Sequence, residues 1–134
     1  LPLVIHSRDA AQDTVDIMKA EKAEEAGGIL HCFSYTKEMA KIFLDMDFSF
    51  GIGGVITFKN AKKLKEAVEY IPMEKIVIET DCPYLSPEPN RGKRNSSLNL
   101  PYVIKAIAEI KNLTEEEVLR ITYENAKKLY RIND

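Results

Sequence analysis

Short apolar runs alternate along this chain with longer stretches whose apolar residues recur at helical spacing. The runs occupy residues 3–5, 28–31, 48–52 and 76–78, and the stretches between them read as amphipathic helices near 11–18, 36–46, 61–71, 101–110 and 114–129. Because the runs are continuously apolar instead of alternating with polar residues, they are typical of strands buried on both faces of a parallel sheet. The sequence therefore predicts an α/β fold made of four strand–helix units.

Two architectures remain open for such a chain. A doubly wound sheet of four strands would be complete in itself, whereas a (β/α)8 TIM barrel of about 250 residues needs twice as many units. With 134 residues, of which 45% are hydrophobic and 30% charged, the chain is expected to form one domain over residues 1–134.

Composition narrows the classes of partner and compartment. A formal net charge of -2 argues against binding nucleic acid through a broadly positive surface, so any anionic partner must be held locally. Cys32 and Cys82 lie far apart, which fits neither a disulfide framework nor a cysteine zinc site and indicates a reducing, cytoplasmic location. The absence of an apolar run of about 18 residues predicts that the protein has no membrane partner.

Three predicted strands end in a residue that can bind a metal ion. His6 closes the first strand, His31 closes the second and Asp81 closes the fourth. Parallel α/β folds carry their chemistry at the carboxyl ends of the strands, and divalent ions such as zinc or manganese accept imidazole and carboxylate ligands together. We therefore predict that these three side chains form a metal site.

Strand periodicity adds two neighbours to this site. Side chains alternate with period two, so Arg8 is expected on the face of His6, and Glu79 on the face of Asp81. Arg8 is then a candidate phosphate clamp, and Glu79 a candidate catalytic carboxylate that orients a ligand or a water. An ion pair between Arg8 and Glu79 is the structural alternative.

A long polar loop follows the fourth strand, over residues 83–99, and contains Arg91, Lys93 and Arg94. Three charges normally mean a solvated loop, but just after the Asp81 strand they are candidates for binding substrate phosphates. Residues 51–54 contain Gly-x-Gly-Gly, but the last glycine of the G-x-G-x-x-G dinucleotide fingerprint and the Gly-Lys-Ser/Thr of a P-loop are missing. We therefore expect these glycines to allow tight packing.

Five segments together resemble a known family. They are PLVIHSRDA (residues 2–10), ILHCFS (29–34), GIGGV (51–55), ETDCPYL (79–85) and RGKRN (91–95). In sequence, order and spacing they closely resemble successive motifs of TatD-type deoxyribonucleases. The resemblance implies a distorted (β/α)8 barrel of the metallo-dependent hydrolase superfamily, of which this chain supplies the C-terminal half, strands five to eight.

Carried over by position, the resemblance implies that His6 and His31 bind metal and that Asp81 is the strand-eight carboxylate that handles the nucleophilic water. Glu79, Arg8 and the loop of residues 91–95 become supporting candidates. The implied reaction is hydrolysis of phosphodiester bonds in DNA with divalent Mg, Mn or Zn as cofactor. Tyr35 and Cys82 depart from the family pattern, where Gly and Ser are common, without removing a ligand.

The family's first-strand His-x-His pair and strand-four Glu have no counterpart among these residues. The resemblance therefore implies that the chain is catalytically incomplete without an N-terminal half. Unpaired strand edges also favour a homo-oligomer or pairing with that half. A non-catalytic truncated fragment and a doubly wound domain that binds a small phosphorylated ligand remain as alternatives.

Overall fold

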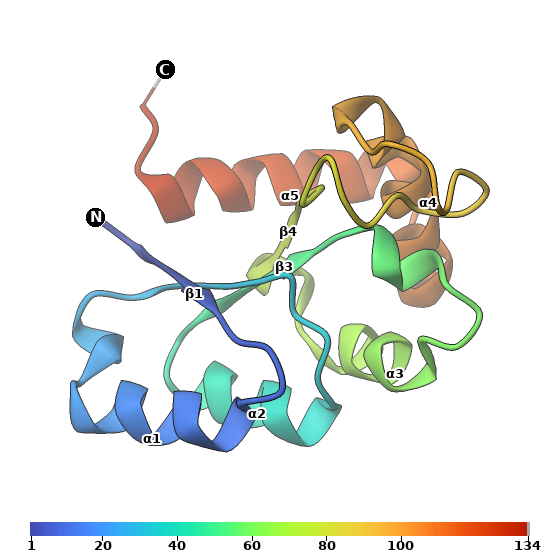
Figure 1. Cartoon of the computed structure of the whole chain (residues 1–134). Helices are drawn as coiled ribbons and strands as arrows, with labels where there is room; N and C mark the ends of the chain where they lie inside the picture. The colour runs from blue at the N-terminus through green and yellow to red at the C-terminus, as the bar shows by residue number, and fades with distance from the viewer. Residues whose placement is uncertain (134) are drawn as a thin grey trace.

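The computed structural model describes residues 1–133, which contain one four-stranded parallel sheet (Figure 1). The strands are β1 (Leu3–His6), β2 (Gly28–His31), β3 (Ser49–Ile52) and β4 (Ile76–Ile78). Each strand pairs in parallel with the next one in the chain, so the spatial order is β1-β2-β3-β4. The four strands expected from the apolar runs are all present.

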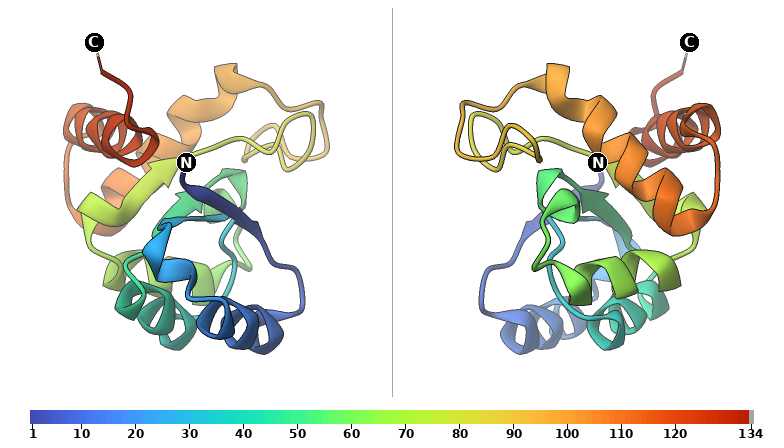
Figure 2. Two further views of the ribbon diagram at one scale, coloured as in Figure 1. Left: turned by 90° about the vertical axis from the view of Figure 1, so that its left-hand side faces the viewer. Right: turned by 90° about the vertical axis from the view of Figure 1, so that its right-hand side faces the viewer.

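Five α-helices and four short 3-10 turns connect and cover these strands. The helices are α1 (Ala11–Ala20), α2 (Lys37–Asp45), α3 (Lys62–Tyr70), α4 (Leu100–Lys111) and α5 (Glu115–Tyr130), and the turns are η1 (Ala23–Glu25), η2 (Gly54–Thr57), η3 (Met73–Lys75) and η4 (Ser97–Asn99). Consecutive helices contact each other, α1 with α2 and so on to α4 with α5. Figure 2 shows this succession running around the sheet.

Two of the helices begin at caps that the sequence predicts. Thr36 accepts a hydrogen bond from the backbone N–H of Met39 at the start of α2. At the start of α5, Thr114 and Glu117 bond each other's backbone N–H groups in a capping box. The third unit differs from expectation, because a 3-10 turn separates β3 from α3 and Ala61 caps that helix instead of lying within it.

The strand order decides between the two architectures. A doubly wound sheet reverses its strand order at a switch point, where the connections change from one face of the sheet to the other. No reversal occurs in β1-β2-β3-β4, so the chain winds in one direction as a (β/α)8 barrel does. The self-contained doubly wound domain was therefore the wrong alternative.

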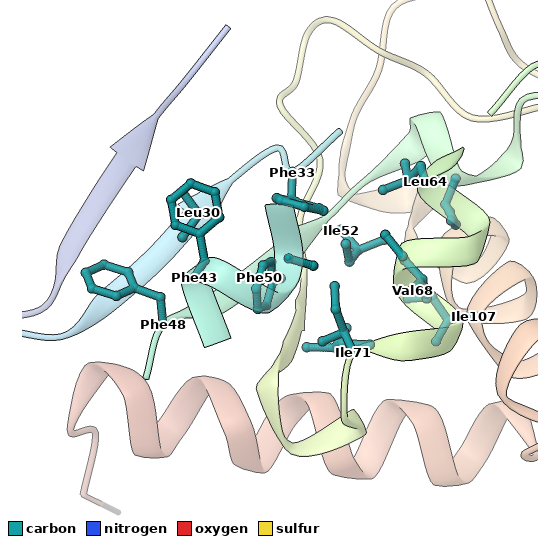
Figure 3. Close-up of a cluster of buried hydrophobic side chains, with 14 of the residues drawn as sticks. Leu30, Phe33, Phe43, Phe48, Phe50, Ile52, Leu64, Val68, Ile71 and Ile107 are labelled. Atoms are coloured by element: carbon teal, nitrogen blue, oxygen red, sulfur yellow. The ribbon is translucent and has the colours of Figure 1, made fainter. Parts of the chain in front are cut away.

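Aromatic and branched side chains fill the space between sheet and helices (Figure 3). Phe33 lies near the centre, edge-on to Phe50 at 4.9 Å and to Phe43 at 6.5 Å between ring centroids. Such edge-to-face pairs add about 0.5–1.5 kcal/mol each beyond the burial of their area. This core fixes the carboxyl end of β2, which carries His31.

The free side of β1 is much less covered than the centre of the sheet. Val4 is 59% exposed and Leu3 is 37% exposed, whereas Leu30 and Phe50 on the inner strands are buried.

None of the helices in residues 1–133 combines the length and apolar character needed to cross a bilayer.

Candidate metal and phosphate site

Two histidines stand side by side at the carboxyl edge of the sheet. His6 and His31 are register partners at the last positions of β1 and β2. Their ring centroids lie 6.3 Å apart, with the ring planes inclined by 35°. Parallel pairing thus brings together two imidazoles that are far apart in the sequence.

His31 lies between two carboxylates. Its Nδ1 is 2.9 Å from Oε2 of Glu79, and its Nε2 is 3.2 Å from Oδ1 of Asp81. Because an ionised carboxylate only accepts hydrogen bonds, Nδ1 donates to Glu79, which fixes the orientation of the ring. Nε2 is then the ring nitrogen that faces Asp81 and the pocket.

Asp81 is not the last residue of its strand. β4 ends at Ile78, and Asp81 lies in the following turn with the left-handed backbone angle φ 55°. The period-two argument for a shared face of Glu79 and Asp81 therefore rests on a strand that is too short. The two carboxylates nevertheless meet at His31, because Glu79 leaves the sheet next to β3 and the turn brings Asp81 back.

Gly51 of β3 and Gly54 of η2 allow neighbouring segments to approach closely. A Cβ at Gly51 would collide with Oε2 of Glu79, and one at Gly54 would collide with the carbonyl oxygen of Leu85. The glycine-rich segment thus serves close packing, as the sequence predicts. Within residues 1–133, the other Glu79 oxygen, Oε1, is buried without a partner of normal hydrogen-bond geometry, which is unusual for a charged group.

Cys32 belongs to the same cluster, although the sequence pattern did not predict it as a ligand. Ligand atoms of His31, Cys32 and Asp81 all lie within 4.8 Å of one another, a group that can hold a metal ion. Burial, and then the negative charges of Glu79 and Asp81, raise the pKa of the Cys32 thiol to about 12. The sequence feature that could have predicted Cys32 as a member of this cluster was its position next to His31. Both cysteines are free thiols, as expected.

These side chains open onto a pocket of about 540 Å³. His6, Arg8, His31, Cys32 and Asp81 are among its lining residues. No ion pair joins Arg8 to Glu79 in the described part of the chain, so that alternative was wrong. Arg8 instead lines the pocket together with the two histidines.

A second pocket, of about 750 Å³, is lined by the basic loop, which we define as residues 90–95. Arg91, Lys93 and Arg94 line it, and Tyr84 and Leu85 line both this pocket and the histidine pocket. The guanidinium carbon of Arg91 lies 3.8 Å from the centroid of the Phe58 ring, a cation–π contact that holds one end of the loop. The predicted metal side chains and the basic residues therefore lie in adjoining hollows.

Tyr35 is a second residue whose role the sequence did not reveal. Its hydroxyl lies 2.8 Å from Oγ of Ser7 and accepts a bond of 3.2 Å from the N–H of Ala10. The loop that carries Arg8 is thereby fastened to the loop after β2. In the sequence, Tyr35 was notable only because glycine is common at this position in the family.

Comparisons with known proteins agree with the fold and the motifs. A family model described as TatD related DNase matches residues 1–131. The chain is 53% identical to the metal-dependent hydrolase YabD of Bacillus subtilis over 133 residues, 99% of this chain and 52% of that protein. It is 43% identical to the metal-dependent hydrolase TatD of Mycobacterium tuberculosis over 129 residues, 96% of this chain and 48% of that protein.

Solved structures of TatD proteins share the fold. The TatD homologue YJJV of Escherichia coli superposes with a TM-score of 0.90 at 23% identity, over 99% of this chain and 51% of that one. A TatD family hydrolase of Entamoeba histolytica gives a TM-score of 0.85 at 22% identity, over 96% and 50%. The chain thus spans about half the length of the relatives it matches, and its architecture is that of half a TIM barrel. It belongs to the family of TatD related DNases.

Proposed function

We propose that this chain forms part of a metal-dependent hydrolase that cleaves phosphodiester bonds in DNA. The observation that carries the proposal is the position of His31, held by Glu79 on one side and facing Asp81 on the other, at the rim of a pocket that adjoins the basic loop. His6 stands beside it on the neighbouring strand.

The residues present suit a divalent ion. Imidazole nitrogen and carboxylate oxygen are donors that Zn²⁺ and Mn²⁺ accept, and Mg²⁺ accepts the carboxylate with water. His31 and Asp81 would hold the ion together with His6. The ring of His6 lies 6.3 Å from that of His31, and the donor atoms within 4.8 Å of one another are those of His31, Cys32 and Asp81. When bound, a divalent ion lowers the pKa of a coordinated water from about 15.7 toward 7 and neutralises phosphate charge.

The surrounding side chains supply the rest. Glu79 keeps Nδ1 of His31 occupied, so that Nε2 points to the pocket. The carboxylate of Asp81 would take a proton from water, and the planar fork of Arg8 would bind a phosphate oxygen; both residues line the pocket. Each of these roles requires the side chain to lie at the rim of the histidine pocket.

Substrate would run from the histidine pocket into the basic one. With a net charge of -2, the chain needs positive charge concentrated at the substrate, and Arg91, Lys93 and Arg94 provide it. Tyr84, 71% exposed between the two pockets, offers a ring on which a base can stack. DNA with at least one unpaired strand is the substrate that this arrangement fits best.

A complete site needs a partner segment. The chain spans about half the length of its relatives, and β1, whose Leu3 and Val4 are exposed, is an edge strand of the sheet in residues 1–133. We infer that an N-terminal half barrel pairs with this edge and adds the missing ligands, and that a homo-oligomer is the alternative way to cover it. We expect residues 1–134 on their own to fold as one domain without catalytic turnover. We propose a cytoplasmic location for the whole protein.

The test is nuclease activity with Mn²⁺ and single-stranded DNA. The chain is assayed alone and together with the half of Bacillus subtilis YabD that it does not match. We expect cleavage only in the mixture, with Asp81→Asn slowing it by about 10²–10⁴-fold, as is typical for loss of a general base. Asp45→Asn, on the exposed face of α2 in a pair with Lys41, is the matched control and should be silent. An unchanged rate in Asp81→Asn would refute the assignment.

The basic pocket has its own test. Lys93→Ala should weaken single-stranded DNA binding at low salt and reduce the slope of log affinity against log salt by about 0.7, the value for one phosphate contact. Lys19→Ala, in the last turn of α1, is the control. Equal effects of the two changes would show that the attraction is diffuse and that the loop is only solvated.

A further inference from the structure

The turn that carries Asp81 receives little support from the sheet. β4 ends at Ile78, and Asp81 has a left-handed backbone, a conformation that is uncommon outside glycine although Asp adopts it more often than most residues. Inside the turn, Tyr84 N–H donates to Asp81 O at 3.0 Å and Cys82 N–H donates to the Thr80 hydroxyl at 3.1 Å. These local bonds shape the turn but do not anchor it to the rest of the protein.

The anchor is Asn95, a residue at the far end of the basic loop. Its side chain is buried, with 4% of the residue exposed, and Nδ2 donates to Thr80 O and to Tyr84 O, both at 2.8 Å. Those two carbonyls flank Asp81 on either side. The backbone N–H of Asn95 adds a third bond, of 3.0 Å, to Pro83 O.

Every polar atom of the Asn95 amide is in use. Oδ1 accepts from the N–H of Ser96 and from Nδ2 of Asn99, each at 2.9 Å. A side chain of this size therefore needs two donors on one side and an acceptor on the other, which only an amide provides. Asn99 in turn accepts from Nδ2 of Asn90 at 3.1 Å, at the start of the basic loop.

We propose that Asn95 is a positioning residue, whose amide fixes the turn so that the Asp81 carboxylate stays against Nε2 of His31. The inference rests on the metal site proposed above, since Asp81 is one of its ligands. A group that holds a ligand in place typically contributes about 10–100-fold to metal affinity. Asn95 also ties the Asp81 turn to the loop that carries the basic residues.

The chain supplies a matched control at the other end of β4. Asn125 of α5 donates through Nδ2 to Met73 O at 2.7 Å and to Ile76 O at 2.8 Å. Asn95→Ala and Asn125→Ala therefore each remove two bonds from a side-chain amide to backbone carbonyls, and Asn95→Ala also removes the two bonds that Oδ1 accepts from Ser96 and Asn99. Only the first pair of carbonyls flanks Asp81.

Two measurements separate positioning from stability. We expect Asn95→Ala to weaken Mn²⁺ binding by calorimetry about 10–100-fold and to shift the ring ¹⁵N resonances of His31 without metal. Asn125→Ala should lower the melting temperature but leave both unchanged. Asn99→Ala, which removes one partner of Asn95 and spares the turn, should show a smaller change in the same direction if Asn95→Ala folds poorly.

The inference would be overturned if Asn95→Ala and Asn99→Ala kept the wild-type Mn²⁺ affinity and the wild-type His31 resonances. It would also be overturned if Asn125→Ala changed the affinity and the resonances as much as Asn95→Ala does. Absence of Mn²⁺ binding by the unaltered chain would instead count against the proposed metal site. The His31 resonances need no metal, so they still decide the role of Asn95 in that case.

Discussion

Replacing Gly51 by alanine should test how tightly β3 and Glu79 are fitted together. Gly51 lies within β3, and a Cβ there would collide with Oε2 of Glu79, the oxygen that accepts from His31. The Glu79 side chain is only 16% exposed, so it cannot simply swing into water. The added methyl group must therefore break the bond to His31.

The size of the effect follows from that bond. A hydrogen bond to a charged group contributes about 1.5–3 kcal/mol. Against this, alanine is favoured over glycine in a strand interior by about 0.5–1 kcal/mol, because glycine loses more backbone entropy on folding. Gly51→Ala should thus lower the free energy of unfolding by about 0.5–2.5 kcal/mol.

The sign should reverse when Glu79 is shortened. In a Glu79→Ala background the colliding oxygen is gone, and the nearest remaining neighbour of the new Cβ is Leu30 O at 3.4 Å, an ordinary contact. Gly51→Ala should then stabilise the protein by about 0.5–1 kcal/mol. Urea unfolding of the four proteins of this double-mutant cycle gives the coupling energy, expected near 1.5–3 kcal/mol.

A coupling energy near zero would refute the reasoning. If Gly51→Ala were equally harmful in both backgrounds, the damage would come from the strand itself and not from Glu79. Gly92→Ala, in the exposed loop where a Cβ meets nothing within 4 Å but φ is +83°, shows what backbone strain alone costs.

Three further predictions concern single side chains. Tyr35→Phe removes the hydroxyl bonded to Ser7 and should cost about 1 kcal/mol in urea unfolding. Hydrogen bonds from Thr114, at the start of α5, lower the pKa of Glu117, so the folded state binds the Glu117 proton less tightly than the unfolded state does. The carboxylate therefore stabilises the fold above pH 4.5, and this stabilisation is lost on acidification. Glu117→Gln should make the free energy of unfolding depend less on pH in that range. Burial raises the pKa of Cys32 to about 12, and because the thiolate is the reactive form, Cys32 should be alkylated much more slowly at pH 8 than the exposed Cys82.

Each of these has a clear opposite outcome. Tyr70→Phe alters an exposed ring, and a cost as large as that of Tyr35→Phe would mean that the Ser7 bond contributes nothing specific. An acid transition of Glu117→Gln as steep as the original would deny the carboxylate its role. Mass spectrometry that finds Cys32 labelled as fast as Cys82 would show that its thiol is not shielded by burial.

Much of the fold could be predicted because buried parallel strands have a simple sequence signal. The four apolar runs, the capping residues and the glycine packing follow from local rules, and the pairing of His6 with His31 follows from both being the last residues of adjacent strands. Strand order could not be read from these runs, because periodicity describes each element and says nothing of its neighbours. The sequential order is a tertiary property, and it decided between the two architectures.

The site was less predictable where the chain leaves regular structure. Asp81 was placed on β4 because period-two alternation was extended through Glu79 beyond the apolar run of residues 76–78, whereas the strand ends with that run, at Ile78. Asn95 and Tyr35 act through hydrogen bonds to residues far along the chain, and such bonds have no periodic signature. Cys32 joins the cluster through a left-handed turn after β2, a conformation that the sequence does not reveal.

The match between chain order and strand order has a consequence for biosynthesis. A strand that leaves the ribosome finds its neighbour already made, so the sheet can grow in one direction without waiting for distant partners. Asn125, which bonds to the carbonyl oxygens of Met73 in η3 and of Ile76 in β4, belongs to α5, which is translated after the four strands. We therefore expect β4 to be locked only when α5 emerges, and arrested nascent chains that lack α5 should be cut first near Ile76 by added protease.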